Sequence, residues 1–322
     1  MERVLDQPAR LRQSETARSL AAAFALMVVL LLVAPLAIYP VFLMQALCFA
    51  LFACAFNLLI GYVGLISFGH ALFFGWASYL TAHAAKVWAL PPELAIIFGT
   101  AAAALLGLVA GGLAIRRQGI YFAMITLALA QMMYFFALRA KFTGGEDGIQ
   151  GVPRGRLFGL FDLSHELTMY GFVLVVVLAG LLVIYRIINS PFGEVLKAIR
   201  ENEPRAVSLG YRTERYKLVA FVLSATLAGL AGSMKSLVFQ LASLTDVHWT
   251  MSGEVVLMTL LGGMGTIFGP LVGALAIVGL ESYLARFGQW VTVITGAIFV
   301  VCVLAFRRGI VGELGAWWAR RR

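Results

Sequence analysis

Long apolar runs separated by short charged links recur along this chain, and they limit its fold more than any other feature. Each run holds about 20 residues, the length of helix needed to cross ~30 Å of hydrocarbon. The clearest runs are residues 20–39, 41–60, 93–115, 119–138, 168–188, 218–239 and 289–306. With 61% of its residues apolar and 13% charged, the chain has about half the charge of a soluble globular protein. The sequence therefore predicts an all-α fold, a polytopic membrane helical bundle.

Two further apolar stretches, residues 61–86 and 260–274, are interrupted by glycine. Glycine in a membrane helix either lets neighbours approach closely or marks a break where the backbone lines a cavity. One interruption lies in each half of the chain, as in transporters built from internal repeats. Broken or re-entrant helices at both places would give about ten transmembrane segments. The residues that we expect to line a translocation path are Ser67, Gly69, His70, Gly262, Gly263 and Gly265. For His70, packing within an apolar helix is the alternative role.

Most of the 25 Lys and Arg residues lie between or beyond the predicted spans, so topology explains them better than nucleic-acid binding does. They gather in an N-terminal tail (residues 1–19), at Arg116 and Arg117, in a central polar segment (residues 189–217) and in a basic C-terminal tail (residues 307–322). Because positively charged links stay in the cytoplasm, both termini are expected there. Residues 20–306 then form the transmembrane domain.

The central polar segment, residues 189–217, is predicted to form two short helices outside the membrane. Ser190 can cap a helix that begins at Pro191. Its apolar residues Phe192, Val195, Leu196 and Ile199 follow at i, i+3, i+4 and i+7 and form one stripe. Pro204 ends this helix and starts a second one, which Gly210 ends. A loop that only fixes orientation does not need this order, so we expect a docking surface for a soluble partner.

A polar loop, residues 139–166, follows the fifth predicted span, and the alternation of spans places it outside the cell membrane. Its motif TGGEDG lacks the ligand spacing of a calcium loop. We expect a turn here that shapes the outer vestibule or a docking face. The turn residues are Thr143, Gly144, Gly145 and Gly148.

The residues that usually carry chemistry argue against catalysis by this chain. Its three cysteines lie in apolar runs without CxxC spacing and its four histidines are scattered, so neither a disulfide nor a metal site is predicted. The GxxxxGK[ST] motif for ATP phosphates is absent. An integral membrane enzyme would need converging catalytic groups. An ion-coupled secondary transporter would need a protonatable cluster inside the spans. Neither is visible in the sequence.

Several motifs stand out by their order and spacing: GLISFGHALFFG, RRQGIYFAMITLALAQ, TGGEDGIQGVP, SPFGEVLKAIRENEPRAVSLG and LLGGMGTIFGPLVGA. Together they resemble the permease subunit of bacterial branched-chain amino acid ABC importers, in its M-type, over roughly residues 20–306. The resemblance implies a bacterial inner membrane location and a heterodimer with a second, H-type permease subunit. It also implies two cytoplasmic ATPase subunits, which bind ATP and Mg, and a periplasmic substrate-binding protein. This chain itself is expected to bind no cofactor, metal or nucleic acid, and to contact membrane lipid.

In that family, the loop equivalent to residues 189–217 is the coupling segment that fits a groove on the ATPase. Other ABC permeases carry an EAA-then-glycine pattern there, of which only Ala206 and Gly210 remain, with Pro204 and Arg205 before them. The residues implied in ATPase coupling are Glu194, Arg200, Glu201, Asn202, Arg205, Ala206 and Gly210.

The resemblance implies that the chain helps to translocate leucine, isoleucine and valine by alternating access. Urea or short-chain amides are the alternative substrates, because related permeases carry them and a largely neutral path would suit them equally. An ion-coupled secondary transporter is the remaining alternative.

Overall fold

The computed structural model describes residues 24–285, 288, 291–305 and 309–313. The predicted N-terminal tail lies outside these residues, as do the start of the first predicted span and most of the predicted C-terminal tail. The chain divides into two compact units, residues 1–43 and 44–322. In the first unit, Phe24–Leu36 is an apolar helix whose last turn is the 3-10 helix η1, Ala34–Leu36.

The described chain is almost entirely helical. Its α-helices are α2 (Pro40–Tyr62), α3 (His70–Lys86), α4 (Pro92–Ala114), α5 (Ile120–Arg139), α6 (Glu166–Ile188), α7 (Pro191–Glu201), α8 (Glu203–Ser208), α9 (Thr213–Phe239), α10 (Trp249–Gly262), α11 (Gly269–Leu284) and α12 (Val291–Ala305). Further 3-10 helices are η2 (Lys141–Thr143), η3 (Gly145–Asp147) and η4 (Leu244–Asp246). The strands, of two residues each, are β1 (Ile149–Gln150), β2 (Arg156–Leu157), β3 (Phe161–Asp162) and β4 (Leu241–Ala242). The predicted all-α bundle is confirmed.

The core of the second unit is built by α3, α4 and α9, which pack against one another. Small residues permit this close packing. A Cβ atom on Gly229 of α9 would lie 2.2 Å from the Cβ of Ala103 on α4. One on Gly107 of α4 would lie 2.6 Å from the Cβ of Ala225 on α9. Because lipid tails give apolar helices no hydrophobic reason to associate, such small-residue contacts are a main source of packing energy between membrane helices.

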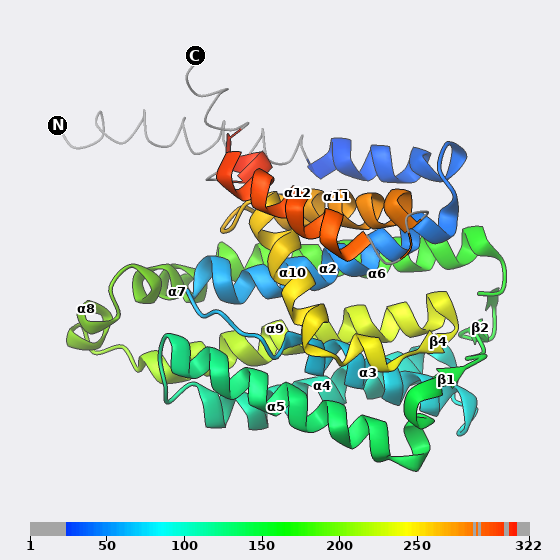
Figure 1. Ribbon diagram of the computed structural model, residues 1–322, viewed down its shortest axis with the longest axis horizontal. Helices are drawn as coiled ribbons and strands as arrows, with labels where there is room; N and C mark the ends of the chain where they lie inside the picture. The colour runs from blue at the N-terminus through cyan, green and yellow to red at the C-terminus, as the bar shows by residue number, and fades with distance from the viewer. Residues whose placement is uncertain (1–23, 286–287, 289–290, 306–308, 314–322) are drawn as a thin grey trace. The chain divides into compact units, whose positions relative to one another are not determined.

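Different connecting segments lie at the two ends of the helices of the second unit. The short helices α7 and α8 extend beyond one end of α9, whereas β1, β2 and β4 lie at the other end (Figure 1). There β1 pairs antiparallel with β4, with Ile149 opposite Ala242, and β2 pairs with β3. We call these the α7 end and the strand end.

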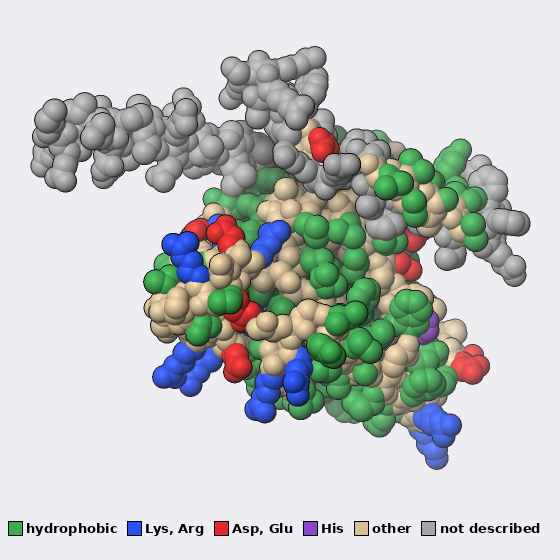
Figure 2. Space-filling view, turned by 60° about the vertical axis from the view of Figure 1, so that its left-hand side comes forward, with side chains coloured by type: hydrophobic (Ala, Val, Ile, Leu, Met, Phe, Trp, Pro, Cys, Tyr) green, Lys and Arg blue, Asp and Glu red, His purple; other side chains and the backbone are tan. Residues whose placement is uncertain are grey.

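Apolar side chains cover much of the outer surface of α4, α5 and α6. Examples with more than half of their surface exposed are Ile97, Leu105, Met124, Phe135 and Val175. Figure 2 shows such hydrophobic side chains over one face, with Lys, Arg, Asp and Glu gathered mainly over the part that carries α7 and α8. A surface of this kind suits contact with lipid rather than water.

Five of the described helices, α2, α4, α5, α6 and α9, are long and apolar enough to cross a membrane. The helices α3, α10, α11 and α12 have 17, 14, 16 and 15 residues, and Phe24–Leu36 is also short. Of the helices beside the two interruptions, α3, α10 and α11 are short, and so is α12, which follows α11. The breaks themselves are confirmed, between α2 and α3 and between α10 and α11.

Candidate functional site

The central polar segment, residues 189–217, folds as two short helices, as its sequence predicts. Ser190 caps α7, since its Oγ accepts a hydrogen bond from the Gly193 N–H at 3.3 Å, and Pro191 is the first residue of the helix. Leu196 and Ile199 are buried. The other stripe residues, Phe192 and Val195, are half-buried. The apolar stripe therefore holds α7 against the bundle.

The second helix, α8, has a cap that the sequence analysis did not identify. The Asn202 Oδ1 accepts a hydrogen bond from the Arg205 N–H at 3.0 Å. Glu203 then joins α8 to the bundle, because its carboxylate lies 2.5 Å from the Nζ of Lys217 on α9. It also accepts a hydrogen bond from the Gln118 side chain at 3.0 Å. Gly210 ends the helix at φ +89°, as predicted.

Most of the residues predicted to couple to an ATPase lie on the surface of this projection. The exposed ones are Glu194, Arg200, Glu201, Asn202, Arg205 and Gly210. Three of their side chains have partners within the chain: Glu194 with Lys197, Asn202 with the α8 backbone, and Arg200 with the Gly61 carbonyl. Ala206 is 2% exposed, so its side chain packs inside the projection and offers no surface to a partner.

Apolar residues at the tip of the projection were missed by the sequence analysis. Val207, Leu209 and Tyr211 follow Ala206, and they are 53%, 69% and 40% exposed. Val207 lies on α8, and Leu209 and Tyr211 follow the end of that helix, so none of them is on a lipid-facing span. Exposed apolar side chains close together outside the spans make this a candidate interaction surface. Nothing in the local sequence indicates that these three side chains are exposed, because their exposure depends on how α8 packs on α9.

The first glycine interruption, residues 63–69, leads from α2 into α3 at a buried polar cluster. Side chains satisfy the backbone N–H groups of the break and of the first turn of α3. The Ser67 Oγ accepts from Gly69 at 3.2 Å, the Thr126 Oγ1 from Phe68 at 3.2 Å and the Ser252 Oγ from Ala71 at 2.9 Å. The predicted path residues Ser67, Gly69 and His70 are therefore together, inside the bundle, at the start of a helix.

His70 joins three helices in this cluster. Ser224 on α9 donates its hydroxyl proton to the Ala55 carbonyl at 2.6 Å. It can therefore accept from the Nε2–H of His70, which is 2.8 Å away. The rings of Phe56, Phe73 and Phe221 surround the imidazole at 5.0–5.9 Å, and its Nδ1 has no partner among the described residues. This geometry fits the packing role, and a place in the path stays a prediction.

The second interruption, residues 263–268, is a tight reversal between α10 and α11 at the α7 end. A Cβ on Gly262 would lie 1.9 Å from the Gly269 carbonyl, so only glycine allows the two chain segments to meet. Gly263 and Gly265 have φ values of +119° and +75°. Asn57 of α2 holds this loop with both ends of its amide: Gly265 N–H donates to Oδ1 at 2.9 Å, and Nδ2 donates to the Thr266 carbonyl at 2.8 Å.

The predicted path residues thus fall into two groups. Ser67, Gly69 and His70 lie at the start of α3, and Gly262, Gly263 and Gly265 lie at the α7 end. The second group meets the end of α2 and the projection at a pocket of ≈ 450 Å³. The pocket is lined by Gly61, Tyr62, Lys197, Arg200, Glu201 and Gly265.

The predicted turn at the strand end is compact. Thr143 is fully buried, and its hydroxyl lies 2.6 Å from the carbonyls of both Ala137 and Ala140. Gly144, Gly145 and Gly148 all have positive φ. A Cβ on Gly148 would lie 2.2 Å from the Ala242 carbonyl, so glycine permits β1 and β4 to pair directly after the turn. A role for this turn in a vestibule or docking face stays a prediction.

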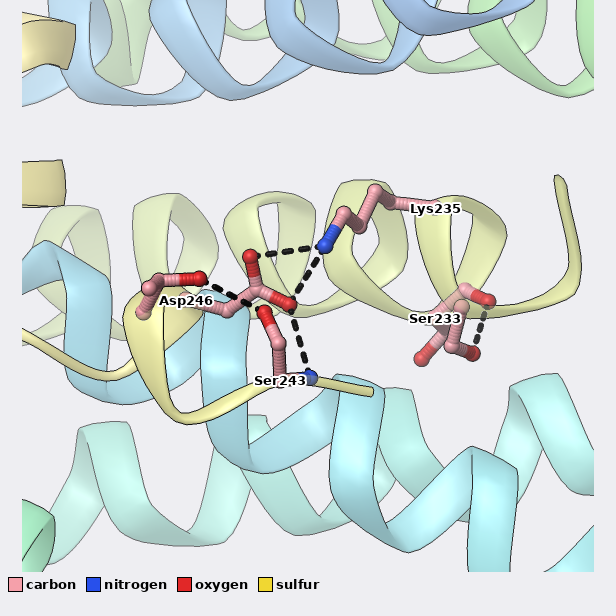
Figure 3. A network of polar contacts seen from close by, with 6 residues as sticks. Ser233, Lys235, Ser243 and Asp246 are labelled. Carbon is pink, nitrogen blue, oxygen red and sulfur yellow. Dashed lines mark hydrogen bonds and ion pairs between the residues drawn. The ribbon is translucent and has the colours of Figure 1, made fainter. Parts of the chain in front are cut away.

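A paired acid and base that the sequence analysis did not predict is buried in the second unit. Lys235 of α9 reaches Asp246 of η4, and both are buried, with 8% and 2% of their surfaces exposed (Figure 3). Asp246 also accepts from the Ser243 N–H, which caps η4. Asp246 lies in η4, between β4 and α10, and its burial follows from the packing of η4 against α3.

Comparison with known proteins supports the resemblance seen in the motifs. A family model described as the permease component of branched-chain amino acid transport systems matches residues 38–304. The chain is similar to the high-affinity branched-chain amino acid transport system permease protein LivM of Escherichia coli, with 27% identity over 277 residues. That alignment covers 79% of this chain and 65% of the relative's length. LivM of Salmonella typhimurium is 26% identical over 282 residues, with the same coverage.

Permeases for other substrates are also similar to this chain. The fructose import permease protein FrcC of Rhizobium meliloti is 26% identical over 232 residues, covering 67% of this chain and 63% of that protein. No solved structure matches the chain.

Proposed function

Because this chain belongs to the family of branched-chain amino acid transport permease components, and to its M-type, we propose that it is a membrane-spanning subunit of an ABC importer for leucine, isoleucine and valine. The observation that carries the proposal is the family match over residues 38–304, which includes both glycine interruptions and the central polar segment. The relatives named LivM support the same substrate class.

The proposed complex contains a second, H-type permease, two ATPase subunits and a periplasmic binding protein. ATP and Mg bind to the ATPase subunits, and hydrolysis takes place there. The α7 end faces the cytoplasm in this proposal and the strand end faces the periplasm. The basic residues of the two tails place both chain termini in the cytoplasm as well. The concentration of Lys and Arg near the α7 end supports this orientation, because such residues stay on the cytoplasmic side.

The central polar segment is then the surface on which an ATPase subunit docks. Exposed Val207 and Leu209 supply apolar contact, and exposed Arg205 and Glu201 supply charge around it. An interface with an apolar centre and a polar rim is the usual arrangement between proteins. Closure of the two ATPases on ATP would move the segment, and the bundle would alternate between outward-facing and inward-facing states.

Import permeases for fructose and ribose are also similar to this chain, so the substrate is the part of the proposal that the experiment tests most directly. In an importer of this type the binding protein selects much of the substrate. Urea and ribose are therefore included as competing substrates in the experiment below.

The test is ATP-driven uptake into proteoliposomes that hold this chain, its H-type partner, both ATPases and the binding protein. Labelled leucine, urea and ribose are supplied in parallel, with vesicles lacking ATP and vesicles lacking the binding protein as controls. Leucine uptake that requires both components is the expected result. Uptake of urea or ribose without leucine would transfer the assignment to that substrate. Uptake of leucine driven by an ion gradient without ATP would overturn the proposal.

A further inference from the structure

Arg200 of α7 is bonded to the first glycine-interrupted segment and lies beside the second. Its Nη1 donates a hydrogen bond to the carbonyl of Gly61, at the end of α2. The same nitrogen lies 3.3 Å from the place that a Cβ on Gly265 would occupy, in the loop between α10 and α11. One side chain of the central polar segment therefore reaches segments that are far apart in the sequence.

Two glycines, Gly64 and Gly265, make room for this side chain. A Cβ on Gly64 would lie 3.1 Å from the Cγ of Arg200, so the aliphatic stem of the arginine runs across a bare backbone. Gly64 and Gly265 have φ values of +81° and +75°, a backbone conformation that glycine adopts without strain. A Cβ on Gly61 would lie 2.2 Å from Asn57 Oδ1, so a glycine is also required where Asn57 holds the loop.

Asn57 makes the two segments behave as one body at this place. It belongs to α2, the helix that ends at the first break. Its amide binds the Gly265 N–H and the Thr266 carbonyl of the second break. A force applied to either segment is thus carried to the other. Arg200 is attached to this shared body and not to one segment alone.

Little else connects α7 to that body. Among the described residues, the bond from Arg200 to the Gly61 carbonyl is the only side-chain hydrogen bond between α7 and either segment. The neighbouring space is the pocket of ≈ 450 Å³, whose lining includes Lys197 and Glu201 on the α7 side. Lys197 is engaged with Glu194 on its own helix. Arg200 therefore makes the polar contact between α7 and this body beside the pocket.

We propose that Arg200 transmits the movement of α7 to both glycine-interrupted segments, and so sets how much substrate is moved for each ATP hydrolysed. The inference rests on the proposed function, because it requires that an ATPase moves α7. Arg200 is a positioning residue in this proposal: it touches neither substrate nor nucleotide. Replacing Arg200 should uncouple ATP hydrolysis from leucine transport, while the permease and ATPase subunits still assemble.

The first test measures leucine uptake and ATP hydrolysis in the same reconstituted complex. For Arg200→Ala, the ratio of leucine transported to ATP hydrolysed should fall by about tenfold, the effect of losing one hydrogen bond to a charged group. Arg200→Lys keeps a cationic donor and should restore most of the ratio. Lys197→Ala, on the same helix but paired only with Glu194, is the matched control and should leave the ratio unchanged.

The second test follows movement directly. In a chain whose three native cysteines are replaced by alanine, a single cysteine is placed at exposed Ala198 on α7 or at Met264 in the loop, which is 44% exposed. Labelling by a maleimide is compared with and without ATP and vanadate. With Arg200 present, both positions should change their labelling rate. With Arg200→Ala, Ala198→Cys should still respond and Met264→Cys should not.

The outcomes separate the two proposals. If the unmodified complex transports no leucine, the proposed function fails and the role of Arg200 in leucine import fails with it. If the complex transports leucine while Arg200→Ala keeps the normal ratio, or Met264→Cys still responds to nucleotide in that variant, the inference about Arg200 is wrong and the proposed function stands. A complex that loses its ATPase on Arg200→Ala would also contradict the inference, because the arginine would then be a docking contact.

Discussion

Lys235 of α9 and Asp246 of η4 form an ion pair inside the bundle, with Nζ 2.7 Å from Oδ1 and 2.6 Å from Oδ2. This contact joins the last turns of a long membrane helix to the segment that leads into α10. Both side chains have lost nearly all of their water, so each depends on the other for its stability.

Replacing one member of this pair should be more harmful than replacing both. Lys235→Met leaves the Asp246 carboxylate buried without its cation, and we expect a loss of ~3–5 kcal/mol in the free energy of unfolding. The double variant Lys235→Met with Asp246→Leu should recover to within about 1 kcal/mol of the parent, because no charge remains to be buried. Thermal unfolding of the purified chain in detergent measures both. Lys197→Met removes an exposed pair with Glu194 and should change stability by less than about 1 kcal/mol. A single variant as stable as the parent would show that the pair contributes nothing.

Leu209→Asp should weaken binding of the ATPase without affecting the fold of the permease. Leu209 is 69% exposed at the tip of the central polar segment. The new carboxylate would therefore face water in the free permease and an apolar surface of the ATPase in the complex. We expect the amount of ATPase that purifies with the permease to fall by about tenfold or more, as for an interface residue of central importance. Leu160→Asp is the matched control, because Leu160 is 81% exposed at the strand end. Equal loss of ATPase in both variants would contradict the docking surface.

Asn57→Ala should release the loop between α10 and α11. Asn57 is 3% exposed, and the change leaves the Gly265 N–H and the Thr266 carbonyl without their partner. The expected cost is ~1–3 kcal/mol in thermal unfolding, the penalty for unsatisfied buried polar groups. Asn57→Asp should not restore the parent's stability, since a carboxylate cannot donate to a carbonyl. Asn189→Ala removes one exposed side-chain hydrogen bond, to the Tyr185 carbonyl, and serves as the control with little expected effect.

Gly229→Ala should disturb the packing of α9 on α4. The added methyl would lie 2.2 Å from the Cβ of Ala103, so the helices must separate. We expect a loss of ~1–3 kcal/mol, the usual cost of an extra methyl group in a filled core. Gly253→Ala makes the same change in α10, where no atom lies within 4 Å, and should be neutral or stabilising by up to ~1 kcal/mol because alanine favours helix. Unfolding temperatures that rank the two variants in the opposite order would show that the contact is not tight.

Local signals in the sequence predicted the parts of the fold that depend on neighbouring residues. Ser190 and Pro191 start α7 where expected, and Gly210 ends α8. The two glycine interruptions also lie where predicted, because each glycine there allows the backbone conformation of the turn in which it lies. Helix ends and breaks of this kind are encoded within a few residues.

Contacts between distant segments were not predictable in the same way. Arg200 was expected to face a partner, yet it binds Gly61, more than a hundred residues earlier. The pairing of Lys235 with Asp246 was not predicted, because Asp246 is buried through the packing of η4 against α3. Ala206 matched a family pattern but is buried, whereas Val207 and Leu209 beside it are exposed. These differences follow from how helices lie on one another, which periodicity does not specify.

The length of α9 has a consequence for how the two faces of the membrane communicate. Its 27 residues are uninterrupted, and Lys217 near its start and Lys235 near its end each hold a carboxylate of another element. At 100° per residue, the 18 positions between them make five full turns and ~27 Å, so both lysines leave the same side of the helix. A twist of α9 about its own axis would strain both attachments together, whereas a tilt of the whole rod would carry a displacement from one membrane surface to the other.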